Sequence, residues 1–211
     1  MSEAAAAAAR GPATEADPSF VTDRAWFDRS AEQVAPELLG MLLAHDTPQG
    51  RIAGRIVEVE AYLGPEDLAA HSSHGLTPRN AAMFGEPGHL YVYFVYGVHY
   101  CANVVCGPGA KPEAVLLRAA ALTQGEELAR WRRGPVDARR LAAGPGNLAS
   151  AFGIDRRLNR ADLVTGPIRL AAGPAPAAIE RTARIGVAYA GDWAARPLRF
   201  VIADDPHRSR R

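Results

Sequence analysis

Two glutamates stand two residues apart in a run of strand-forming residues, as Glu58 and Glu60 of the sequence EVEAY. On one strand such residues share a face about 7 Å apart, so the two carboxylates could act as the pair with which glycosidases cleave a glycosidic bond. Paired glutamates are also common on solvated strand faces, where they do no chemistry. We select Glu60 as the candidate catalytic base, because the neighbouring side chains suit a buried site.

Histidines follow the glutamates closely, in the sequence AHSSHG. The spacing of His71 and His74 would allow a metal site together with Glu60 or Asp67. A zinc site needs further ligands at defined spacing, and no third ligand is defined here. We therefore predict no metal and no other cofactor, and interpret His71 as a neutral hydrogen-bond donor to a substrate.

Tyrosines are concentrated in the sequence LYVYFVYGVHY. Tyrosines of a hairpin usually pack half-buried with their hydroxyls reaching water, and Tyr62, Tyr91 and Tyr93 have that simple interpretation. Tyr96 differs because it precedes a glycine at an expected turn, where an aromatic ring is poorly placed for a core. A ring at such a tip can insert between base steps, as in proteins that bend duplex DNA.

The elements that position these residues are mainly short strands. Residues 41–62 alternate around a Pro-Gln-Gly turn, which predicts a hairpin. Residues 89–105 predict a second hairpin with its turn at Tyr96 and Gly97. A short strand ending in Arg118 is predicted for AVLLR, and further strands for PIRLAA, ARIGVAYA and RPLRFVIA.

Helices are predicted in three places. One begins at a capping box of Ser30 and Gln33 and ends near Gly40. A second lies within residues 123–141, with a break at Gly134 and Pro135. The third follows the turn of GPGNLASAFGI, which lacks the lysine of a phosphate-binding loop. Short strands with few helices predict an α+β fold, a single domain with a curved, mostly antiparallel β-sheet or partial barrel and flanking helices.

The length of 211 residues, 48% of them hydrophobic, suits one domain with a full core. We place it at residues 19–204, between a disordered Ala-rich tail of residues 1–18 and a basic tail of residues 205–211. The N-terminus lacks the features of a secretory signal. On one strand, Cys101 and Cys106 would point to opposite faces about 16 Å apart and could not pair. We expect a soluble, cytoplasmic protein without a membrane anchor, associated with the nucleoid in a prokaryote.

The basic residues are almost all arginines, and Lys111 is the single lysine. Schiff-base chemistry would depend on Lys111 or on the terminal amine, which favours a water nucleophile. A net charge of +1 does not exclude DNA, since contact with phosphates is local. Eight arginines could supply a basic face: Arg79, Arg118, Arg139, Arg140, Arg156, Arg157, Arg181 and Arg184.

The chain resembles the alkyladenine (3-methyladenine) DNA glycosylases of the mammalian type. The resemblance rests on EVEAYLGPEDLAAHS, TPRNAAMFGEPGHLYVYFVYGVHYCANVV, AVLLRA, AGPGNLASAFGI and RIGVAYAGDWAARPLRF, in the family's order. It implies a monofunctional enzyme that flips alkylated or deaminated purines out of duplex DNA and excises them by hydrolysis, the first step of base excision repair. It also implies double-stranded DNA as the partner, and chemistry on one lesion at a time suits a monomer.

The resemblance also implies catalytic roles. Glu60 matches the family's catalytic carboxylate, which activates the attacking water. Arg118 matches the arginine that helps to position that water, and the backbone carbonyl of Ile185 would complete the water site.

Five further side chains match positions that contact the base or the duplex. Tyr62, His71 and Tyr93 match the lining of the pocket around the flipped base. Asn103 matches the asparagine that crowds the exocyclic amine of normal guanine. Tyr96 matches the tyrosine that fills the gap left in the duplex.

Two other classes of protein remain open from the residues. An N-glycosidase acting on free nucleosides would need the pocket but would have no use for Tyr96. A non-catalytic nucleic-acid-binding module would have no use for Glu60, whose charge is a liability next to DNA phosphates.

Overall fold

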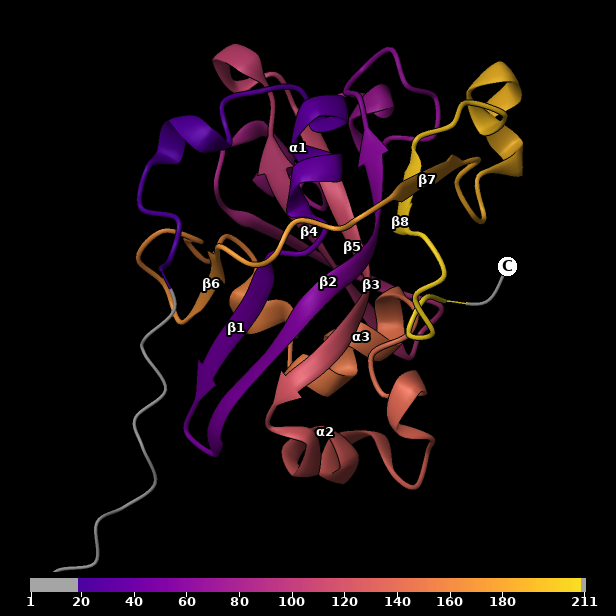
Figure 1. Cartoon of the computed structure of the whole chain (residues 1–211). Coiled ribbons are helices and arrows are strands. Elements are labelled where there is room, and N and C mark those ends of the chain that lie inside the picture. Colours follow the sequence, from indigo (N-terminus) through magenta and orange to yellow (C-terminus); the bar gives the residue numbers. More distant parts are fainter. Residues whose placement is uncertain (1–18, 210–211) are drawn as a thin grey trace, which may run out of the picture.

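The centre of the sheet is a long strand that changes partners along its length. The computed structural model describes residues 19–209, and its β1 (Leu42–Thr47) and β2 (Gly50–Tyr62) form the expected hairpin (Figure 1). The first half of β2 pairs with β1, and the later residues 58–60 pair with β8 (Arg199–Ile202). Its other edge pairs with β5 (Glu113–Gln124). Glu58 and Glu60 therefore lie between two partner strands, in the interior of the sheet.

The remaining strands extend the sheet on both sides of this centre. The strand order is β3-β4-β5-β2-β1-β6, and β8 pairs with both β2 and β7. Every pairing between these strands is antiparallel. The curled sheet forms a half-barrel, which confirms the predicted α+β fold. The bounds are β3 Leu90–Val95, β4 His99–Cys106, β6 Ile168–Ala171 and β7 Ile179–Thr182.

Bulges bend the two central strands where the glutamates lie. Glu58 faces Ala119 and Val59 faces Leu117, so the register passes over Arg118. A second shift lies between Ile56 and Glu58 on the other strand. Because a bulge bends a strand and redirects a side chain, Arg118 does not have the orientation that simple alternation would give. Its backbone carbonyl accepts a hydrogen bond from Gly144 N–H, at 2.9 Å.

The helices pack against the sheet from opposite ends. In the part of the chain described, they are α1 (Ala31–Leu38), α2 (Glu126–Arg133) and α3 (Pro145–Phe152), with short 3₁₀ turns between other elements. Figure 1 shows α1 above the middle of β2, with α2 and α3 towards the far end of β5. The glycine at position 54 allows the close approach of this end, since a Cβ there would lie 2.9 Å from Ala121 O and 3.2 Å from the Phe152 ring.

The start of α1 is where we predicted it, but its cap is different. The Ser30 hydroxyl contacts the side chain of Gln33 and not a backbone N–H, so the expected capping box is not formed. The Ala31 N–H instead donates to Glu113 Oε2, at 2.7 Å. A carboxylate on β5 thus provides the anion that the first turn of a helix favours. Pro36 lies within the last turn, and the helix ends at Leu38.

Two strand predictions need correction. AVLLR is part of the much longer β5, and Arg118 lies in its middle and not at its end. Pairing with β2 extends the strand through AAALT, because tertiary contacts override weak local preference. ARIGVAYA is not a strand: it leads into the 3₁₀ segment Ala188–Ala194, and the neighbouring β7 is formed by IERT. The positive φ values of Gly186 and Gly191 are incompatible with an extended strand.

The hydrophobic core fills the space between the sheet and the helices. Phe27, Leu38, Leu117, Leu148 and Phe152 are among its fully buried side chains. Cys101 and Cys106 are both buried and free, as we predicted. Within residues 19–209, no helix is long and apolar enough to cross a membrane.

Candidate active site

A cavity of about 330 Å³ opens between the β3–β4 hairpin and the segments around residues 69 and 187. This volume is at the small end of the usual range for ligand pockets. Aromatic rings, an amide and a guanidinium face the cavity together. Six of the seven side chains selected from the sequence line it: Tyr62, His71, Tyr93, Tyr96, Asn103 and Arg118.

Glu60 is the seventh, and it lies beneath this lining with no exposed surface. Its Oε1 accepts a hydrogen bond from the Ile185 N–H at 2.8 Å, and Arg118 Nη1 is 3.3 Å from the same oxygen. Its Oε2 accepts from the Tyr62 hydroxyl at 3.0 Å. Burial raises the pKa of Glu60 above the ordinary glutamate value, although the charge of Arg118 opposes this shift. A carboxylate with a raised pKa is better matched to accepting a proton near neutral pH.

Arg118 joins the two glutamates. Its Nε donates to Glu58 Oε1 at 2.7 Å, while its Nη1 is directed at Glu60. Burial opposes the ionisation of Glu58, but the hydrogen bond from Arg199 and the charge of Arg118 together lower its pKa. Glu58 does not belong to the cavity lining described above. The two carboxylates therefore share an arginine and do not flank a common substrate, so the glycosidase-like pair is not formed.

His71 contacts two tyrosines on β3. Its Nδ1 and the Tyr91 hydroxyl are 2.9 Å apart, and its ring is in edge contact with Tyr93 at a centroid distance of 4.6 Å. Burial lowers the pKa of His71, and the charge of Arg79 adds to this effect. The imidazole is therefore neutral near pH 7. When the Tyr91 hydroxyl donates to Nδ1, the ring carries its proton on Nε2, from where it can donate to a ligand.

Sequence reasoning gave Tyr91 only a packing role, but the residue is part of this site. It lines the cavity, it is almost completely buried, and burial raises its pKa to about 12. Its backbone carbonyl also accepts a hydrogen bond from Asn103 Nδ2 at 3.1 Å, which fixes that amide. The signal was present in the sequence, because Tyr91 and Tyr93 are two residues apart and so share a face of one strand.

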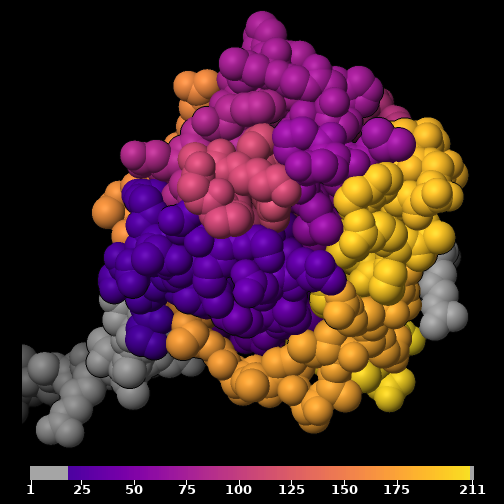
Figure 2. Space-filling model, turned by 90° about the horizontal axis from the view of Figure 1, so that it is seen from above, coloured from indigo at the N-terminus to yellow at the C-terminus, as the bar shows by residue number. Residues whose placement is uncertain are grey.

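A buried ion pair joins two walls of the cavity. Arg184 Nη2 donates to Asp67 Oδ1 at 2.8 Å, and both side chains are fully buried. The guanidinium also donates to the Ala61 and Trp193 carbonyls and lies over the Tyr62 ring, 4.7 Å from its centre. Figure 2 shows the purple segment near residue 70 beside the yellow segment near residue 190. Arg184 was predicted as part of a basic face, and its burial makes that assignment wrong.

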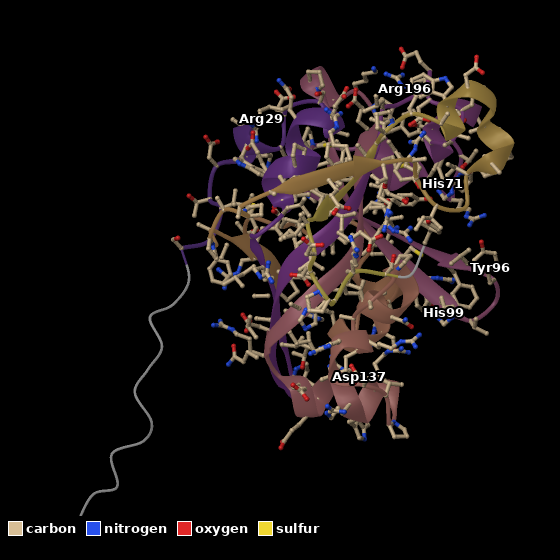
Figure 3. All side chains as sticks on the ribbon, turned by 45° about the vertical axis from the view of Figure 1, so that its right-hand side comes forward. Arg29, His71, Tyr96, His99, Asp137 and Arg196 are labelled. Carbon is tan, nitrogen blue, oxygen red and sulfur yellow. The ribbon has the colours of Figure 1, made fainter. Side chains whose placement is uncertain are left out.

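The rim of the cavity is formed by exposed rings. Tyr96 exposes 88% of its surface at the tip of the β3–β4 hairpin, and Tyr189 exposes 70% on the segment after Ile185. Figure 3 shows Tyr96 and His99 at the outer end of this hairpin, with His71 above them. Tyr96 and Gly97 have φ values of 54° and 69°, so both central residues of the turn are left-handed. This tight turn suits a hairpin but is unusual for tyrosine.

The other predicted features differ in where they lie. Arg79, Arg139, Arg140, Arg156, Arg157 and Arg181 are exposed, whereas Arg118 is buried in the site. Among residues 19–209, no three His, Cys, Asp or Glu side chains gather as a metal site would require. His74 contacts the Ser73 hydroxyl and not His71 or Glu60.

Known proteins resemble the chain over almost its whole length. The family model for methylpurine-DNA glycosylase matches residues 25–206. A protein of Methanocella arvoryzae is 45% identical over 193 residues, which cover 90% of this chain and 96% of that protein. One of Streptomyces avermitilis is 46% identical over 87% of this chain and 88% of its own, and one of Burkholderia lata is 51% identical over 74% of each. All three carry the name 3-methyladenine DNA glycosylase. The chain belongs to the methylpurine-DNA glycosylase family.

Proposed function

We propose that this DNA glycosylase of alkylated purines holds a flipped purine in the cavity and hydrolyses its N-glycosidic bond with water activated by Glu60. The position of Glu60 carries the proposal: it is fully buried, beneath a cavity of aromatic rings, with a raised pKa and three fixed partners. A base inside a duplex cannot present its glycosidic carbon to water, so the nucleotide must first rotate out of the stack.

The lining of the cavity favours a damaged purine over a normal one. Alkylation at N3 or N7 makes the ring cationic, and the faces of Tyr62 and Tyr93 attract a cation through their π electrons. The neutral imidazole of His71 can donate a hydrogen bond to the lesion without repelling its charge. Asn103, held by the Tyr91 carbonyl, would crowd the exocyclic amine of guanine. Together these contacts select charge and shape.

The chemical step needs only a base and a leaving group. Glu60 accepts a proton from water as the water oxygen attacks the sugar carbon. The electrons of the broken carbon–nitrogen bond pass to the purine, and an alkylated purine leaves as a neutral molecule. Arg118 and the Ile185 N–H hold Glu60 Oε1 before the reaction, which removes the cost of reorganising the site. The backbone carbonyl of Ile185 is the proposed second contact of the water.

The rim suits duplex DNA as the substrate. The exposed ring of Tyr96 would enter the gap that the flipped nucleotide leaves. Exposed Arg139, Arg140 and Arg156 can contact phosphates on either side of the lesion. One cavity acts on one lesion, so a monomer is sufficient, and the enzyme works in the compartment that holds the chromosome.

The test is single-turnover release of bases from duplex oligonucleotides that carry 7-methylguanine, hypoxanthine or ethenoadenine, with EDTA present. We expect the wild-type protein to release at least one of these bases, and Glu60→Gln to release it at least about a hundredfold more slowly. Binding of the same duplexes by Glu60→Gln serves as the control for folding and recognition. Absence of release from all three duplexes would contradict the proposal, and equal rates in both proteins would remove Glu60 from the mechanism.

A further inference from the structure

The carboxylate of Glu58 is held more completely than that of Glu60. Glu58 Oε1 accepts hydrogen bonds from Arg118 Nε at 2.7 Å, from Arg199 Nε at 2.8 Å and from the Ser209 hydroxyl at 2.7 Å. Its Oε2 accepts from the Ser209 N–H at 2.6 Å. A fully buried carboxylate with four donors is a built feature. It lies outside the cavity, so direct contact with a substrate does not explain it.

Two of these four donors come from the C-terminal segment. The sequence predicted a basic tail there, and the structure places residues 205–209 against the central strands. Arg55 Nη2 donates to Asp205 Oδ2 at 2.7 Å, and Asp205 Oδ1 accepts from the His207 N–H at 2.9 Å. These contacts lead the chain back to Ser209, whose side chain and backbone are mostly buried. The Ser209 hydroxyl donates to Glu58 and accepts from Arg118 Nη2, at 3.3 Å.

Each nitrogen of the Arg118 guanidinium therefore has a different partner. Nε donates to Glu58, Nη2 to Ser209, and Nη1 is directed at Glu60. Because the guanidinium is planar with its donors in fixed directions, the first two contacts determine where the third nitrogen points. The buried cluster also balances in charge, with the carboxylates of Glu58 and Glu60 against the guanidiniums of Arg118 and Arg199.

We propose that Glu58 and Ser209 are positioning residues that fix Arg118 on Glu60, so that the C-terminal segment is a working part of the active site. This inference rests on the proposed function of Glu60. Loss of the Ser209 hydroxyl removes one donor from Glu58 and one acceptor from Arg118, and the guanidinium can then rotate away from its setting. A hydrogen bond to a charged group is worth about 1.5–3 kcal/mol, so a slowing of the chemical step by about tenfold is expected.

The cluster also affects the pH at which Glu60 is active. The charged and titratable groups around Glu60 are Glu58, Tyr62, Tyr93, Cys101, Arg118 and Arg199. Of these, Glu58 raises the pKa of Glu60 and also shares the charge of Arg118. Glu58→Gln removes a negative charge and leaves Arg118 to Glu60 alone, so it lowers the pKa of Glu60. The rate rises with pH as Glu60 loses its proton, and the acid limb of the pH profile should therefore move to lower pH.

The decisive experiment compares Ser209→Ala with Ser209→Thr in single-turnover excision of 7-methylguanine from duplex DNA. Ser209→Thr keeps the hydroxyl and the backbone N–H, and we expect a rate constant close to that of the wild type. Ser209→Ala should reduce the rate constant about tenfold without weakening duplex binding. Ending the chain after Arg208 should have a larger effect than ending it after Arg210, because only the first change removes both donors of Ser209.

Glu58→Gln adds the pH readout, but it leaves two buried guanidiniums with one carboxylate and can unfold the protein. The Ser209 variants therefore carry the test if it does not fold. A lower unfolding temperature of Ser209→Ala with an unchanged rate constant would overturn the inference, since the contact would then be structural only. An unmoved acid limb in folded Glu58→Gln would overturn the electrostatic part. Absence of base release by the wild type would instead refute the proposed function itself.

Discussion

At the base of the cavity, each of the four carboxylate oxygens of Glu58 and Glu60 accepts a hydrogen bond or faces a guanidinium, and neither residue is exposed. At the rim, Tyr96 and Tyr189 present most of their rings to solvent. The base consists of strand residues in the interior of the sheet, and the rim consists of a hairpin tip and a 3₁₀ segment. Chemistry needs groups that are fixed before the reaction. Insertion into a duplex needs groups that can leave water, so their burial waits for the DNA.

This difference predicts that changes at the base cost folding stability, whereas changes at the rim cost only activity on DNA. The buried pair of Arg184 and Asp67 gives the largest effect. Removal of one partner of a buried ion pair leaves the other charge uncompensated, so Arg184→Ala should lower the free energy of unfolding by about 3–5 kcal/mol. Urea denaturation followed by circular dichroism measures this change.

The matched control is Arg157→Ala, because Arg157 also has a carboxylate partner, Asp155, at 2.7 Å but is highly exposed. Exposed ion pairs contribute about 0–1 kcal/mol. Similar losses in the two variants would show that burial of the wall pair is not what stabilises the base of the cavity.

The next effect is at the rim. Tyr96→Ala should leave the free energy of unfolding within about 0.5 kcal/mol of the wild type, since the ring is exposed. The same change should slow excision from a duplex by about tenfold or more, because base–aromatic stacking is worth about 1–3 kcal/mol. Excision from a single strand, where no gap needs filling, should change much less.

Trp131→Ala is the control for Tyr96, as Trp131 exposes 78% of its surface on α2 and does not line the cavity. It should leave the rate of excision unchanged. An equal loss in both variants, or none in Tyr96→Ala, would refute the role assigned to the hairpin tip.

The third prediction concerns pH and tests the base alone. Glu60 must be ionised to accept a proton, and burial raises its pKa above the usual 4.5. The rate should therefore fall about tenfold for each pH unit below the pKa of Glu60, starting closer to neutrality than for an ordinary glutamate. Excision of 7-methylguanine is the suitable assay, because this cationic base needs no acid to leave. A rate independent of pH down to 4.5, in protein that remains folded, would contradict the assignment of Glu60.

The smallest effect is expected on specificity. Asn103 is fixed by the Tyr91 carbonyl at the cavity wall. Asn103→Ser should relieve crowding against the amine of guanine and raise the slow release of normal guanine a few-fold, with little change for hypoxanthine. Competition between the two bases in one duplex library measures the ratio. A fall in both rates would indicate that Asn103 supports the wall and does not select the base.

The sequence by itself determined the hairpins, the α+β class and the residues of the cavity lining. Alternation and turn residues placed β1 with β2 and β3 with β4, because these contacts are local and depend on neighbouring residues. The ordered motifs indicated Glu60 and its six companions, and the family assignment is confirmed. Local patterns could not give the length of β5 or the absence of a strand in ARIGVAYA, since pairing partners distant in sequence decide both.

Only the tertiary structure decided the electrostatics of the site. Alternation put Glu58 and Glu60 on one face, but their different pKa shifts depend on Arg118, Arg199 and Ser209, which lie 58 to 151 residues away from them in the chain. The register shift at Arg118, between Glu58 and Val59 on β2, turns that side chain towards both carboxylates. A sequence lists charges in order, whereas a pKa depends on burial and on the distances between charges. Those quantities exist only once β2, β5, β8 and the C-terminal segment have met.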